Sequence, residues 1–136
     1  AQTVVQFDGI VVASCVLSVS TPGVLGVSAN SGTEISSELP DGVAAVMSVV
    51  ATAGTPTISF TAPELSVSPG DYNGTPTVAM KYTSLGGANQ PYTSSASQYT
   101  STNPLSDTVT LNAKATDSSG FAAGTYRVQT TATCEQ

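Results

Sequence analysis

Within the first nineteen residues of the chain, every second residue from Val5 onward is apolar, while the other side mixes polar side chains with Val4, Ile10, Val12 and Val16. The apolar side of this pattern holds Val5, Phe7, Gly9, Val11, Ala13, Cys15, Leu17 and Val19, with glycine as the one gap. A period of two predicts a β-strand and not a helix. At about 3.3 Å per residue it would extend on the order of 50 Å, well beyond an ordinary strand. Two interpretations stay open: a strand exported into a neighbouring subunit, or a first strand that bends and serves both sheets of a sandwich.

Strand patterns recur along the rest of the chain between turns rich in Gly, Pro, Asn and Asp, and no segment has convincing helical periodicity. The clearest strand spans 107–116. Others are expected over 24–28, 34–39, 43–53, 57–62, 77–83 and 125–134. Residues 84–106 are poor in hydrophobic side chains and hold either a short strand near Tyr99 or a functional excursion. Seven or eight strands at these spacings predict an immunoglobulin-like antiparallel β-sandwich, with residues 1–136 as one domain.

Charge and composition narrow the classes of partner. The net charge is -6, and charged residues make up only 9% of the chain, against about 25% in typical domains. The scarcity of basic residues argues against binding to nucleic acid or to an anionic membrane surface. No apolar run is long enough for a membrane span. The polar residues are mostly Ser and Thr, and Ala1-Gln2-Thr3 resembles the end left by a signal peptidase. We therefore expect a secreted or cell-surface protein.

Cys15 and Cys134 are the only cysteines, and both lie on the apolar side of their predicted strands. A bridge between them would close a loop of about 119 residues, to which the chain-entropy model assigns roughly 4.7 kcal/mol. The alternative is a pair of buried free thiols. The secreted-looking composition favours the disulfide. A catalytic cysteine is not expected, because the chain has no histidine to activate one.

Both ends of the chain resemble chaperone–usher pilins. Residues 5–15 follow an apolar-x-Phe-x-Gly-x-Val-Val pattern that runs into a cysteine. Residues 123–131 resemble the closing strand of archaic pilins and spore coat U-like proteins, in which a Gly-x-Tyr turn leads into the last strand. The resemblance covers roughly a quarter of the chain. It departs from the family pattern at the disulfide, because the usual second-strand cysteine is missing and the available partner is Cys134.

The resemblance implies a structural subunit of a bacterial pilus or fimbria, exported through the periplasm with a chaperone and an usher. Identical subunits would form a filament, each donating residues 1–13 as a strand to its neighbour by β-strand addition. The side chains that enter the neighbour's pockets would be Val5, Phe7, Gly9, Val11 and Ala13. Gly9 would lie where a bulky side chain does not fit. An alternative for Gly9 is a bulge in an ordinary strand.

Besides a filament subunit, the sequence allows two other functions, a glycan-binding domain and a shell or decoration protein. Tyr82, Tyr92 and Tyr99 surround residues 84–106 and would suit a monomeric envelope or adhesin domain that binds glycan. A shell or decoration protein is a further alternative. Without histidine no Ser-His-Asp or Cys-His arrangement is possible, and two cysteines do not complete a zinc site. We therefore predict no enzymatic activity, no catalytic residue, no metal and no cofactor. Asn73-Gly74-Thr75 is an N-glycosylation sequon.

Overall fold

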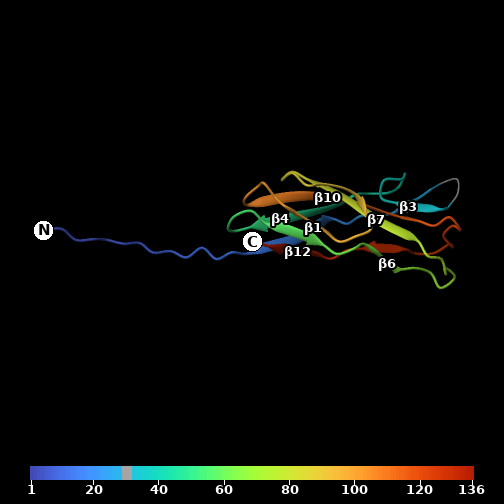
Figure 1. Cartoon of the computed structure of the whole chain (residues 1–136), viewed down its shortest axis with the longest axis horizontal. Coiled ribbons are helices and arrows are strands. Elements are labelled where there is room, and N and C mark those ends of the chain that lie inside the picture. The colour runs from blue at the N-terminus through green and yellow to red at the C-terminus, as the bar shows by residue number, and fades with distance from the viewer. Residues whose placement is uncertain (29–31) are drawn as a thin grey trace.

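β-strands make up all the regular secondary structure in residues 1–28 and 32–136, which are the residues that the structure, a computed structural model, describes (Figure 1). The twelve strands in this part of the chain are β1 (Cys15–Thr21), β2 (Gly26–Val27), β3 (Glu34–Ser36), β4 (Ala45–Ala51), β5 (Thr57–Phe60), β6 (Glu64–Val67), β7 (Thr77–Ser84), β8 (Asn89–Thr93), β9 (Ser97–Thr100), β10 (Ser106–Thr116), β11 (Arg127–Gln129) and β12 (Ala132–Glu135). All pairings are antiparallel.

The first layer is built around β10, the longest strand. Along one side β10 pairs with β4 and then with β3, and along the other side it pairs with β7. β1 extends this sheet beyond β4, β2 extends it beyond β3, and β8 extends it beyond β7. β10 follows the expected 107–116 strand closely, because its alternation of apolar and Thr, Asn or Lys residues suits a strand with one buried face.

The second layer is a long antiparallel ribbon. β12 pairs with β5, and β11 pairs with β6, so that residues 127–135 run back along residues 57–67. Between the two pairs, the Thr61 backbone N–H donates to the Thr131 carbonyl at 3.0 Å and keeps the ribbon continuous. β9 completes this layer on the other side of β5.

The core lies between the two layers. Its fully buried members come from strands of both sheets and include Val49, Ile58, Tyr82 and Val109. This arrangement confirms the prediction of an all-β antiparallel sandwich. The expected seven or eight strands become twelve short ones, because residues 84–106 contain both β8 and β9, the last strand is divided in two, and β6 was not foreseen.

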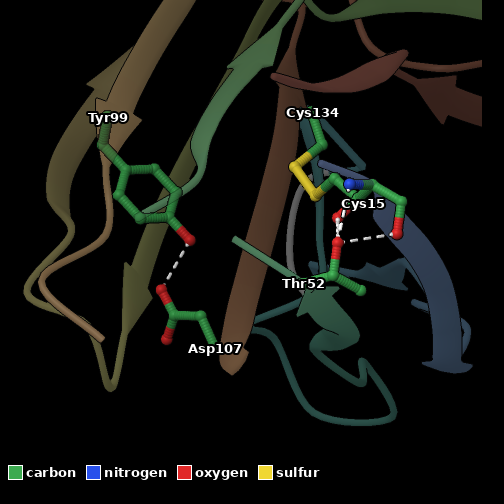
Figure 2. Close-up of a disulfide and its surroundings, with 6 residues drawn as sticks. Cys15, Thr52, Tyr99, Asp107 and Cys134 are labelled. Carbon is green, nitrogen blue, oxygen red and sulfur yellow. Dashed lines mark hydrogen bonds between the residues drawn. A yellow bond between two sulfur atoms is a disulfide. The ribbon is translucent and has the colours of Figure 1, made fainter. Parts of the chain in front are cut away.

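Asp107, near the start of β10, forms hydrogen bonds with Gly86 and Tyr99 in the preceding part of the chain. Its side chain is only 4% exposed. It accepts a hydrogen bond from the Tyr99 hydroxyl at 2.8 Å (Figure 2). The backbone N–H groups of Gly86 and Thr108 also donate to it, each at 2.8 Å. Burial alone would raise the pKa of this carboxyl, but the hydrogen bonds from Tyr99 and the backbone outweigh it and hold the pKa below its ordinary value.

We expect Asp107→Asn to lower the free energy of unfolding by roughly 2 kcal/mol at about pH 7, since the amide loses charge-assisted hydrogen bonds. The folded-state pKa lies below the unfolded value of about 3.9, so the carboxylate stabilises the fold above that value and loses its contribution as pH falls through the folded pKa. Urea unfolding should therefore show the gap between the two proteins closing in acid. Asp71→Asn, at an exposed position, is the control; a gap that stays constant with pH would contradict the assignment.

Candidate functional site

The first fourteen residues lie in no strand and run straight away from the sandwich (Figure 1). Phe7 is 93% exposed and Ile10 is 90% exposed. The expected strand over residues 5–19 therefore begins only at Cys15, and the interpretation that this segment closes its own sandwich is wrong. Exposed apolar runs of this kind mark sites of interaction. We call residues 1–13 the N-terminal segment.

The side chains expected to fill a neighbour's pockets all lie on this segment. Val5, Phe7, Val11 and Ala13 are exposed. Gly9 also lies in open space, since a Cβ built there has nothing within 4 Å. The alternative of a bulge within an ordinary strand does not apply to Gly9, because the surrounding residues form no strand here. Within the described chain, these side chains occupy no groove and pack against no strand.

Two strand edges border an open side of the sandwich. In the part of the chain that the structure describes, β1 pairs only with β4, while β11 and β12 pair only with β6 and β5. β1 leads away from Cys15, whereas β11 and β12 run toward Cys134, which is bonded to Cys15. The two edges therefore run in opposite directions. Each leaves backbone groups available to a further strand.

Between these edges lies an apolar groove made of three connected cavities. The largest, about 480 Å³, has Met47, Phe60 and Leu111 at its floor and Leu17 and Ala132 at its sides. The next two, of about 160 and 320 Å³, continue it away from the disulfide. Each cavity shares lining residues with the next, so the three are continuous. The first and second cavities share Gly23, Ala45, Leu111 and Thr130, and the second and third share Gly23, Leu25 and Val128.

The core is incompletely covered along this groove. Val19 lines it but is 65% exposed. Leu111, at the middle of β10, is only half-buried, although Val109 and Ala115 on the same strand face are completely buried. Complete burial of one such side chain is worth about 1.5–3 kcal/mol. The groove therefore offers a substantial gain to any apolar strand that fills it.

The predicted disulfide between Cys15 and Cys134 is present and joins the two edges at one end of the groove, with a Cα–Cα distance of 6.0 Å. Thr52 holds the base of the N-terminal segment beside it (Figure 2). Its hydroxyl donates to the Val12 carbonyl at 2.7 Å and accepts from the Ser14 N–H at 2.8 Å, and its own N–H donates to the Ser14 carbonyl at 3.0 Å. These bonds continue the line of β1 outward.

The three tyrosines proposed for glycan contact do not form one surface. Tyr82 is 1% exposed and packs on Phe60, with ring centroids 4.6 Å apart. Tyr99 turns inward to Asp107. Burial corrects the expectation for Tyr82, whose ring cannot stack on a sugar, whereas Tyr99 is only partly buried against the core.

Tyr92 lies on the outer face of the first layer. The ammonium groups of Lys114 and Lys81 lie 4.2 and 5.1 Å from its ring centroid. Its hydroxyl donates to Glu38, which pairs with Lys81 at 2.7 Å. Burial and this hydrogen bond raise the pKa of Tyr92 to about 12. The tyrosine is thus engaged by its own neighbours.

Sequence reasoning found the N-terminal segment and, through the resemblance, expected pockets for it, but it did not identify the residues that line them. The alternation of residues puts Leu17, Leu111, Val128 and Ala132 on the apolar faces of their strands. Nothing in this pattern shows that the covering strand is missing. The one available signal was the surplus of alternating residues before Cys15.

No group of three or more His, Cys, Asp or Glu side chains that could hold a metal ion occurs in residues 1–28 and 32–136. In the same residues, no helix is long and apolar enough to cross a membrane. Comparison with models of protein families, with curated proteins and with solved structures gave no match to this chain.

Proposed function

We propose that the protein is a structural subunit of an extracellular filament, in which the N-terminal segment of one copy fills the groove of the next. One observation carries this proposal: a chain whose sandwich leaves an apolar groove also presents an exposed apolar strand pattern that its own fold does not use. β-strand addition would satisfy both, because the incoming backbone pairs with the free edges and alternate side chains enter the groove.

The dimensions of the two parts agree. Residues 7–13, from Phe7 to the end of the segment, are as long as residues 127–133, the part of the second layer's edge that precedes the disulfide. Phe7, the largest side chain of the segment, suits the largest of the groove's three cavities, which is lined by Leu17 and Ala132. Gln6 and Asp8 alternate with the apolar side chains and would stay on the solvent side of the inserted strand.

The cellular setting follows from the same features. Disulfides persist in oxidising compartments, which supports the periplasm and the cell surface. An empty apolar groove with unpaired edges favours aggregation. A periplasmic chaperone that covers the groove, and an usher that exchanges it for the next subunit, would meet this need.

Peptide binding tests the proposal directly. We expect a peptide of residues 1–13 to stabilise a variant that lacks these residues, by about 2.7 kcal/mol at a hundred times the dissociation constant, or by roughly 10 °C in Tm for a domain of this size. The control peptide carries Phe7→Asp and Val11→Asp, which puts carboxylates in the groove. Equal effects of the two peptides, or no effect of either, would contradict the proposal.

A further inference from the structure

We propose that the Cys15–Cys134 disulfide and Thr52 form a stop at one end of the groove, which admits only a strand from another copy and only in one direction. This inference rests on the proposed function and concerns how that function is directed. It assigns a role to the two features that distinguish this end of the sandwich from the other.

The first step is a matter of space. Neighbouring strands in a sheet lie about 4.8 Å apart, so two edges that receive a third strand between them must be roughly 9.6 Å apart. At the disulfide the Cα atoms of the two edges are 6.0 Å apart. No strand can pass between the edges at that point. Around Leu25 and Val128, at the far end of the groove, cavities continue between the edges.

The second step concerns the chain's own segment. To enter its own groove the segment would have to reverse direction at residues 12–14, directly beside the disulfide. No Gly, Pro, Asn or Asp is present there to make a tight turn. The reversal would also break the bonds by which Thr52 holds Val12 and Ser14 in line with β1. The occupant is therefore the segment of a second copy.

The third step fixes the direction of the incoming strand. If Phe7 occupies the largest cavity, near Ala132, residues 8–13 must extend from there to the body of the donating copy. Of the side chains expected to enter the groove, Gly9, Val11 and Ala13 follow Phe7 and only Val5 precedes it, so the longer part cannot lie toward the disulfide, where Cys134 is two residues away. Residues 1–4, which carry none of these side chains, would leave the groove at the closed end. Toward Leu25 and Val128 the groove stays open. The donor strand thus lies antiparallel to β11 and β12, with Val5 nearer the disulfide than Val11.

This direction excludes a closed pair of copies. In a reciprocal dimer each segment would have to reach the partner's groove past the partner's disulfide, because the segment leaves the body at that same end (Figure 1). Entry at the opposite end instead places every copy in the same orientation. Such a head-to-tail contact does not close and generates a filament.

Photocrosslinking in the disulfide-bonded protein tests the inference. Photo-leucine replaces either Val5 or Val11, and isotope-labelled copies are mixed with unlabelled copies so that mass spectrometry separates links between chains from links within one. We expect links between chains, from position 5 to the strand residues around Leu17 and Ala132, and from position 11 to those around Leu25 and Val128. If position 5 links to the residues around Leu25 and Val128 and position 11 to those around Leu17 and Ala132, or if the links form within one chain, the proposed stop is wrong. The groove would still be the acceptor. No link to the groove at all would overturn the proposed function as well.

Removing the bridge gives a second readout. In Cys15→Ala/Cys134→Ala the closed end is free to open. We expect part of the material to shift from an open-ended ladder to species of one and two chains that do not grow with concentration. A double variant that is folded by circular dichroism and yet keeps the wild-type ladder and crosslinks would overturn the role of the disulfide. The crosslinks in the bridged protein decide the matter if this variant does not fold.

Discussion

Removal of residues 1–13 is expected to convert the protein from a ladder of open-ended assemblies into a monomer. The physical reason is that the segment supplies every apolar side chain that would fill the next groove, including Val5, Phe7 and Val11, and each is worth about 1.5–3 kcal/mol when buried. Size-exclusion chromatography with light scattering measures the change. A truncated protein that assembles like the full chain would show that the segment takes no part.

A matched pair of single substitutions separates the two faces of the segment. Phe7→Asp places a carboxylate in the apolar groove and should cost at least about 3 kcal/mol per junction, or on the order of a hundredfold in affinity. Gln6→Asp adds the same group on the solvent face and should leave the ladder intact. Equal loss from both substitutions would mean that the alternation does not decide which side is buried.

The second large effect is expected from filling the groove with one of its own side chains. Ala132 lies at the side of the largest cavity, on β12 opposite Phe60. In Ala132→Phe the new ring occupies the space that a donor side chain needs, so the variant should donate its segment but accept none. By itself it should stay monomeric. Mixed with protein that lacks residues 1–13, which accepts but cannot donate, it should form a complex of one copy of each.

Thr133→Phe is the control for that experiment. It adds the same ring to the neighbouring, exposed position of β12, and the protein should keep its ladder. Light scattering on the mixtures distinguishes the results. A ladder formed by Ala132→Phe alone would contradict the assignment of the groove as the acceptor.

Some of the fold follows from alternation alone, as β10 shows. Apart from Asp107, its inward residues are small or branched apolar side chains, and its outward residues are polar, so most of the buried face was predictable. The bridge from Cys15 to Cys134 was predicted because the secreted-looking composition favours a disulfide over two free thiols and the sequence has no other cysteine. The strand over residues 5–13 did not form, because a period of two tells which side of a strand is to be buried but not in which molecule.

Other elements depend on their partners. β8 contains Pro91 and mostly polar residues, and it is a strand because it pairs with β7 at the sheet edge, where proline is tolerated. β6 has only Leu65 and Val67 as apolar residues, too few for a clear alternation. The burial of Tyr82 could not be read from the sequence, because tyrosine suits either a core or a binding surface.

The position of the disulfide also determines how a filament of these subunits bears tension. The N-terminal segment joins the body at Cys15, and Cys15 is covalently bonded to Cys134 on β12, the strand beside which the incoming donor would lie. Tension applied to the segment is therefore transmitted through the disulfide to β12, the strand that would pair with the next donor strand. The force would be carried as shear along paired backbones, and the hydrophobic core would bear little of it.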